Sequence, residues 1–246
     1  MGWSVDTHWP EWTMLESGKP EVAIIDYGMG NLFSIKRACE SVGLKVCTTF
    51  QKQEILSAKA VILPGVGAFG DAIDTLRKLD LIQVLQEVAL STKPFIGICL
   101  GMHLLMDESQ EFGSHKGLGI IKGCVIRFDN FQEVSGKRLK VPHVGWNRIY
   151  KKNNSNRDLW SNSILEGLTD GEFMYFVHSF YVKPDDPKLI LSTSEYGNIE
   201  LCSSLQYRNI IACQFHPERS GLRGLHIYRN LASIILARSN NFGGDK

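Results

Sequence analysis

The chain has 246 residues, of which 43% are hydrophobic, and its 27 Lys and Arg residues nearly balance its 26 Asp and Glu residues. A chain of this length buries a full core, and its content of 22% charged and 10% aromatic residues excludes a disordered or collagen-like protein. The near-zero net charge produces no field that would favour nucleic acid or an anionic membrane as a partner.

The first twenty residues differ in composition from the rest of the chain. They hold three of the five tryptophans, but neither the basic start nor the apolar stretch of a secretory signal. We expect residues 1–20 to form an extension that packs on the body or stays disordered. Since no apolar run in the sequence is long enough to span a bilayer, we expect a cytoplasmic protein without a membrane partner.

Between residues 21 and 113, short apolar runs alternate with segments of helical period. The apolar runs predict strands over 22–26, 45–49, 60–63 and 95–98. The periodic segments predict helices over 31–42, 71–90 and 100–109. Alternation of buried strands with helices is typical of a parallel sheet that is covered by helices on both faces.

After Gly113 the chain changes to short strand-like runs that are separated by turn clusters. These runs cover 119–128, 138–142, 173–182, 189–194, 199–205 and 210–215. Residues 151–158 are polar and predict an exposed loop, and a last helix fits 222–238. The pattern predicts an antiparallel section joined to the same sheet. We therefore expect one α/β domain over 21–240, with an open, mixed and largely parallel sheet.

One of the six cysteines has a distinctive setting. The six lack the spacing of a metal site or a disulfide framework, so we expect reduced thiols and no metal or other cofactor. Cys99, however, follows the run 95–98 directly and lies between Gly97 and Gly101. A sharp strand-to-helix turn needs small neighbours and places its side chain at the N–H groups of the helix start. Cys99 is therefore a candidate nucleophile, with simple core packing as the alternative.

His216 and Glu218 are the candidate partners of this cysteine. They follow the apolar run 210–215, and Pro217 between them favours an extended conformation at His216. Residues two apart in an extended chain lie on roughly the same side. The carboxylate can therefore orient the imidazole and leave its other nitrogen for the sulfur. An ordinary turn at the end of a strand is the alternative interpretation.

A glycine-rich loop, Pro64-Gly65-Val66-Gly67, follows the strand predicted over 60–63. Its glycines let the backbone present N–H groups at low steric cost. The carboxyl ends of parallel strands share one edge of the sheet, so we expect this loop beside Cys99. It is a candidate oxyanion hole, or an ordinary strand-to-helix turn.

These motifs belong to seven segments that together resemble a known family. The segments are IIDYGMGNLFSI (24–35), PGVGAFGDA (64–72), PFIGICLGM (94–102), GLGIIKG (117–123), KVPHVGWN (140–147), YFVHSFY (175–181) and QFHPERSG (214–221). They resemble class I (triad-type) glutamine amidotransferases, and among these the glutaminase subunits of imidazole glycerol phosphate synthase. The fold that the resemblance implies is flavodoxin-like.

The resemblance implies that L-glutamine is hydrolysed to glutamate and ammonia. Cys99 would attack the side-chain amide, His216 would transfer the protons, and Glu218 would orient His216. The resemblance also implies an oxyanion hole made by the backbone of Gly65, Val66 and Leu100. The glutamine pocket would include Gly67, His103, His178, Ser179 and Phe180.

Position 103 departs from the family pattern, which has Gln four residues after the nucleophile. His103 can still donate or accept a hydrogen bond, but the charge of a histidine depends on pH. The departure leaves open whether His103 contacts the bound glutamine.

The resemblance also implies a protein partner. The ammonia would pass to a separate (β/α)8 cyclase subunit that makes imidazole glycerol phosphate in histidine biosynthesis, because such a barrel needs ~250 residues of its own. Trp146 and Asn147 would face this partner in a heterodimer, unless Trp146 is a core residue. Two further interpretations stay open: a paralogous glutaminase that supplies sugar amidation in surface-polysaccharide synthesis, and a catalytically silent regulatory subunit on the same fold.

Overall fold

The computed structural model describes residues 20–128, 140–152 and 158–241. Nearly all of the expected N-terminal extension and most of the expected loop at 151–158 lie outside these residues. None of the helices in the described part of the chain has the length and apolar character that a membrane crossing requires.

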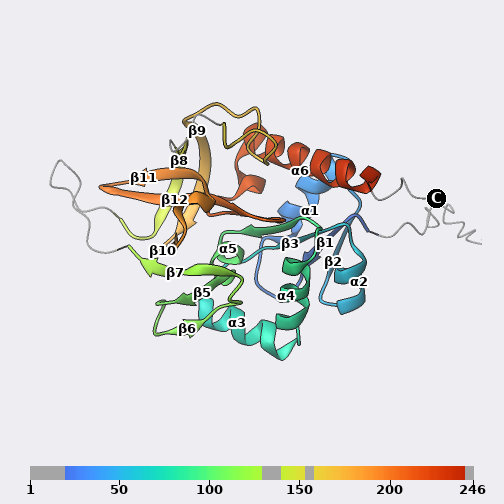
Figure 1. Ribbon diagram of the computed structural model, residues 1–246. Helices are drawn as coiled ribbons and strands as arrows, with labels where there is room; N and C mark the ends of the chain where they lie inside the picture. Colours follow the sequence, from blue (N-terminus) through green and yellow to red (C-terminus); the bar gives the residue numbers. More distant parts are fainter. Residues whose placement is uncertain (1–19, 129–139, 153–157, 242–246) are drawn as a thin grey trace, which may run out of the picture.

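A nine-stranded sheet runs through the molecule in the order β2-β1-β3-β4-β13-β12-β11-β8-β9 (Figure 1). Its first five strands are parallel. They are β1 (Val22–Ile25), β2 (Val46–Thr49), β3 (Ala60–Leu63), β4 (Phe95–Ile98) and β13 (Ile210–Cys213). Their order is the 2-1-3-4-5 order of flavodoxin-like folds, in which ligands bind beyond the carboxyl ends of the strands.

The other four strands of this sheet are antiparallel, as the sequence predicts for the second half of the chain. They are β8 (His143–Lys151), β9 (Glu172–His178), β11 (Ile190–Tyr196) and β12 (Ile199–Tyr207). The sheet is therefore mixed, and its parallel half carries the alternating strands and helices of the first half of the chain.

Helices cover both faces of the parallel half, which confirms the predicted layers. On one face lie α1 (Leu32–Ser41) and α6 (Gly221–Asn241), and on the other lie α2 (Lys52–Ser57), α3 (Phe69–Lys78) and α4 (Ile82–Leu90) (Figure 1). Each face of the sheet has its own hydrophobic core, and successive strand residues point into alternate cores. Ile62 packs with α1 and α6, and Leu63 packs with α3 and α4.

Two helix predictions are wrong in detail. The segment predicted as one helix over 71–90 is two helices, because Asp80 has a positive φ of 54° and breaks the helical path. The helix predicted over 100–109 ends early, since α5 covers only Leu100–Leu104 and is followed by a strand, β5 (Met106–Ser109). Pairing of β5 with β7 overrides the helical period of this segment.

A second, four-stranded sheet lies beside the main one, in the order β10-β7-β5-β6. Its other strands are β6 (His115–Lys116), β7 (Ile121–Arg127) and β10 (Phe180–Pro184). The run predicted as one strand over 173–182 is therefore two strands, β9 in the main sheet and β10 in the second, divided at Ser179. The chain crosses between the two sheets at this point.

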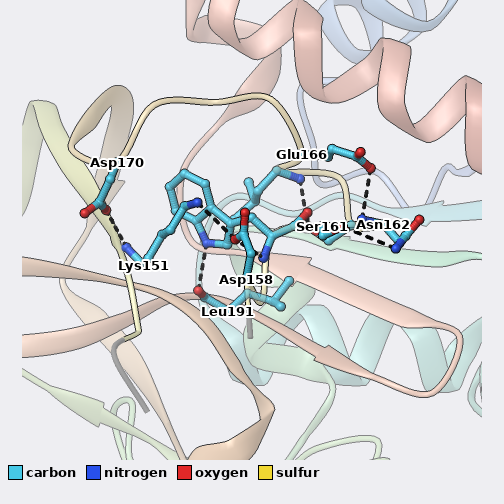
Figure 2. A network of polar contacts seen from close by, with 10 residues as sticks. Lys151, Asp158, Ser161, Asn162, Glu166, Asp170 and Leu191 are labelled. Carbon is cyan, nitrogen blue, oxygen red and sulfur yellow. Dashed lines mark hydrogen bonds and ion pairs between the residues drawn. The ribbon is translucent and has the colours of Figure 1, made fainter. Parts of the chain in front are cut away.

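The segment after β8 is held on the main sheet by a polar network (Figure 2). Trp160 is fully buried, and its indole N–H donates to the carbonyl of Leu191 at 2.9 Å. Lys151 forms an ion pair with Asp158 at 3.0 Å, and its backbone N–H donates to Asp170 at 2.7 Å. These contacts fix the approach to β9, one of the strands that reaches the candidate site.

Candidate functional site

Cys99 occupies a strained turn between β4 and α5. Its φ of 52° and ψ of −111° are unusual for a residue with a side chain, and such strain is concentrated at functional sites. A Cβ on Gly101 would collide with the carbonyl of Leu63, and one on Gly97 would lie 3.0 Å from the carbonyl of Gly101. The two glycines therefore permit the close packing that holds this turn.

His216 and Glu218 lie beside Cys99, although more than one hundred residues separate them in the sequence. His216 follows β13, the neighbour of β4, and is extended with a φ of −103°. Its Nδ1 is 2.9 Å from Oε1 of Glu218, and Cys99 is near enough to favour the charged form of its ring. The Glu218 side chain is fully buried, and Oε1 also accepts from Asn31 at 3.4 Å. The structure thus brings the three predicted catalytic residues together.

The imidazole of His216 is stabilised in its charged form. Burial alone would lower its pKa, but Cys99 on one side and Glu218 on the other outweigh burial and raise the pKa to about 10. The protonated ring is therefore held between a sulfur and a carboxylate. This arrangement suits a group that transfers protons to and from a nucleophilic sulfur.

A cleft of about 630 Å³ opens in front of Cys99, a volume suited to a small molecule. One wall comes from the loop after β3 and the start of α5, and the other comes from the second sheet and the β9–β10 crossing. The lining includes Asn31, Ser34, Val66, Gly67, Cys99, Leu100, His103, Glu111, Phe112, Pro142, Val177, His178, Ser179, Phe180, His216 and Arg219.

The glycine-rich loop after β3 packs directly against the turn at Cys99. Val66, Gly67 and Leu100 line the cleft, whereas Gly65 lies beneath them. A Cβ on Gly65 would come within 2.7 Å of the Leu100 side chain and of the Tyr27 hydroxyl, which itself donates to the carbonyl of Pro64 at 2.8 Å. The backbone on both sides of the predicted oxyanion hole is thus held in one place.

His103 is buried at the base of the cleft. Its Nε2 is 2.7 Å from Oε1 of Gln214, and burial lowers its pKa to about 4 although the hydrogen bond to Gln214 opposes this. His103 is therefore neutral near pH 7. The sequence suggests that the charge of His103 depends on pH, but with this pKa the ring becomes charged only in strongly acidic solution.

His178 also lines the cleft, but both of its ring nitrogens are occupied within the fold. Nδ1 donates to the carbonyl of Phe180 at 2.9 Å, so Nε2 accepts from Nδ1 of His143 at 3.0 Å. Burial lowers the pKa of both histidines, and that of His143 falls to about 4. His178 therefore shapes the wall, and Ser179 and Phe180 are the residues of this segment left to meet a ligand.

Glu111 is a cleft residue that sequence reasoning missed. It is only 8% exposed, and its Oε2 accepts from the backbone of Phe69 at 2.8 Å. Burial raises its pKa, while the hydrogen bond from Phe69 opposes this. The error in the helix predicted over 100–109 concealed this residue, because β5 is the element that carries the chain to the cleft wall. A carboxylate at this point can receive a ligand's ammonium group.

A face of β8 and β9 that exposes several apolar side chains, together with Arg148, borders the cleft. Trp146 is 55% exposed and is not a core residue, and it lies beside Tyr175. Val144 and Phe173 are exposed on the same face, which reaches the cleft at Val177. Asn147, the other predicted interface residue, lies on the opposite side of β8, where its amide donates to the carbonyl of Glu195 at 2.8 Å.

The described residues contain no group of three or more His, Cys, Asp or Glu side chains that could hold a metal ion.

Comparison with known proteins shows which family the sequence matches. The family model described as glutamine amidotransferase class-I matches residues 23–233. Imidazole glycerol phosphate synthase subunit HisH of Geobacter metallireducens is 43% identical over 211 residues, covering 86% of this chain and 97% of that protein. The protein of the same name from Aquifex aeolicus is 43% identical over 208 residues, covering 84% and 93%.

Solved structures share the fold at lower identity. The structure of PurLQS from Thermotoga maritima has a TM-score of 0.62 at 18% identity, and the match covers 90% of this chain and 100% of that chain. A glutamine amidotransferase from Thermotoga maritima has a TM-score of 0.53 at 18% identity, with coverage of 91% and 86%. These two likenesses concern the fold alone and agree with the flavodoxin-like arrangement of the parallel strands.

Proposed function

The chain belongs to the class I glutamine amidotransferases, and we propose that its cleft hydrolyses L-glutamine through a thioester on Cys99. It is a glutaminase that serves imidazole glycerol phosphate synthesis in histidine biosynthesis, like the HisH subunits with which it shares 43% identity over most of both chains. The observation that carries the mechanism is the arrangement of Cys99, His216 and Glu218 at the end of one cleft.

The first half of the reaction releases ammonia. The thiolate of Cys99, which lies beside protonated His216, attacks the side-chain carbonyl carbon of glutamine, and a C–S bond forms while the carbonyl oxygen becomes an oxyanion. His216 gives its proton to the amide nitrogen, the C–N bond breaks, and ammonia leaves. Glu218 holds the imidazole and stabilises its charged form, in keeping with the 2.9 Å contact. The product left in the cleft is a glutamyl thioester.

The second half regenerates the enzyme. His216, now neutral, takes a proton from water as that water attacks the thioester carbon. The C–S bond then breaks, glutamate leaves, and His216 is again protonated beside the sulfur. In both halves the backbone at Leu100 and at Gly65–Val66 receives the oxyanion, since fixed N–H donors stabilise this charge where it develops.

Opposite the nucleophile, Glu111 offers a carboxylate for the α-ammonium group of glutamine. Its backbone contact with Phe69 holds the carboxylate at the wall of the cleft. Ser179 and Phe180 complete this side, and Gly67 lies on the other. These contacts would fix the substrate at both ends, so that the amide carbon rests near the sulfur.

The ammonia is transferred to a separate (β/α)8 synthase subunit in our proposal. The exposed face of Val144, Trp146, Phe173 and Tyr175 is the surface we assign to this partner, because large exposed aromatic groups are typical of interfaces. The face adjoins the cleft at Val177, which gives the ammonia a short path. A dry path keeps ammonia unprotonated and hence nucleophilic.

Replacing the nucleophile tests the proposed chemistry. Cys99→Ala is expected to lower glutamine hydrolysis by a factor on the order of 10,000 or more, because no other group forms the thioester. Release of glutamate would be measured with the synthase partner and its ligand present. The same complex should still make imidazole glycerol phosphate from added ammonium salt, since that reaction needs no glutaminase. Glutamate release by Cys99→Ala at the wild-type rate would exclude the mechanism.

Complementation tests the pathway. The gene should restore growth without histidine to a strain that lacks its glutaminase subunit. A glutaminase for sugar amidation on the same fold would hydrolyse glutamine but fail to restore growth despite good expression. A catalytically silent subunit would fail in both assays.

A further inference from the structure

Gln214 is a fully buried amide beside the nucleophile, and the mechanism above gives it no role. It follows β13 directly, and its backbone N–H donates to the carbonyl of Ser203 at 2.9 Å. Its side chain reaches in two directions. Nε2 is 3.8 Å from the sulfur of Cys99, and Oε1 is 2.7 Å from Nε2 of His103.

We propose that Gln214 is a positioning residue for the nucleophile: its amide N–H donates to the sulfur of Cys99, and His103 holds the amide in that orientation. The proposal rests on the proposed function of Cys99. It also gives His103 a task that differs from contact with glutamine. The residue that departs from the family pattern would act on the sulfur through Gln214.

The hydrogen bond between His103 and Gln214 determines which way the amide faces. Neutral imidazole carries one N–H, and His103 is neutral because burial lowers its pKa to about 4. An amide oxygen can only accept, so with Nε2–H of His103 as donor the oxygen of Gln214 faces the ring. The amide N–H₂ then faces the sulfur. The reverse orientation would set the oxygen against a negatively charged sulfur, which is electrostatically unfavourable.

The charged imidazole of His216 also favours the thiolate, but a further contact of the sulfur has the opposite preference. The carbonyl of Val177 lies 3.7 Å from Sγ of Cys99 and can accept the S–H of the thiol. The same carbonyl repels a thiolate, whereas the amide N–H₂ of Gln214 attracts it. When the thiol of Cys99 loses its proton, the sulfur therefore loses its favourable contact with the Val177 carbonyl and gains one with the Gln214 amide. Gln214 is fully buried, so bulk water does not compete for its contact with the sulfur, whereas the contact with Val177 is partly buried and borders the cleft.

Alkylation of Cys99 by iodoacetamide measures this effect, because the thiolate is the reacting form. The rate would be followed in the full chain from pH 5 to 10 by mass spectrometry of the Cys99 peptide, which separates it from the other five cysteines. Gln214→Met keeps the length and apolar bulk of the side chain but removes the donor. We expect its alkylation at pH 7 to be about tenfold slower, with recovery at higher pH.

Variants at position 103 test whether His103 orients the amide. His103→Leu removes the donor and should slow alkylation in the same direction, whereas His103→Gln restores a donor and should keep the wild-type profile. The double variant His103→Leu with Gln214→Met should react no more slowly than Gln214→Met alone, since both changes act through one amide.

Asn209 provides the matched control. It is a buried amide at the other end of β13, where it donates to the carbonyls of Val88 and Lys93 at 3.1 and 2.8 Å. Asn209→Leu should leave the alkylation profile of Cys99 unchanged. Circular dichroism and thermal unfolding would establish that each variant is folded before it is compared.

Three results would overturn the proposal. A folded Gln214→Met with the wild-type profile would show that the amide does not act on the sulfur, and faster alkylation would show that the oxygen faces it. A wild-type profile for His103→Leu would remove His103 from the arrangement. Failure of the proposed function is a separate observation, because it would be seen as absence of glutamine hydrolysis by the unmodified chain with its partner.

Discussion

The buried histidines around the cleft differ in charge because their neighbours differ. His216 lies between Cys99 and Glu218, which together raise its pKa to about 10. His103 and His143 have neutral neighbours, so burial dominates and lowers the pKa of each to about 4. One site thus contains a protonated imidazole for proton transfer and neutral imidazoles that act as directed hydrogen-bond donors.

The low pKa of His103 predicts a loss of stability in acid. Between pH 6.5 and about 4 the unfolded chain binds a proton at this histidine and the folded chain does not, so the free energy of unfolding falls as pH is lowered. His103→Gln removes this proton uptake. Urea unfolding should therefore show the variant gaining stability relative to wild type as pH falls from 6.5 to 4. A constant difference across this range would contradict the assignment.

Glu218 and Cys99 were predictable from the sequence because short motifs determine their positions. Gly97 and Gly101 mark the turn at Cys99, and Pro217 extends the chain between His216 and Glu218. Gln214 opens the same segment as His216, but no pattern in the sequence assigns it a role, and no motif marks Glu111. Their roles depend on which distant side chain lies opposite, and sequence spacing does not encode that.

At the level of secondary structure, the parallel half of the sheet was predictable and the second sheet was not. Strands such as β3 and β4 are continuous apolar runs, and burial on both faces requires that pattern. β5 has mixed composition and is a strand because it pairs with β7. The crossing at Ser179 likewise depends on tertiary structure, because the apolar run 173–182 pairs with one sheet before Ser179 and with the other after it. The secondary structure of the far wall was therefore beyond prediction, although the family resemblance indicated that His178, Ser179 and Phe180 belong to it.

Trp160 is expected to hold the segment between β8 and β9 against the sheet. It packs with the α6 face of the core and donates to Leu191, so Trp160→Ala should lower the free energy of unfolding by about 3–5 kcal/mol. Trp160→Phe keeps most of the apolar contact but leaves the carbonyl without its donor, and should cost about 1–3 kcal/mol. Urea unfolding measures both. Equal losses in the two variants would mean that packing of the ring contributes little.

At the scale of the whole molecule, the two halves of the main sheet have different tasks. The parallel half supplies Cys99 from β4 and His216 from β13, at the carboxyl ends of adjacent strands. The antiparallel half supplies the exposed face of β8 and β9. Because Val177 belongs both to that face and to the cleft, a partner bound there would lie against the wall that contacts the nucleophile.

Trp146 is expected to anchor this partner. Its 55% exposed side chain would be buried on association, and Trp146→Ala should weaken binding of the (β/α)8 synthase subunit by about 30- to 1,000-fold, as measured by titration calorimetry. Leu90→Ala is the control, because Leu90 is 78% exposed at the end of α4, near the amino ends of the strands and away from the cleft. It should bind as wild type does. Wild-type affinity in a folded Trp146→Ala would place the partner on another surface, and the ammonia path would then have to leave the cleft elsewhere.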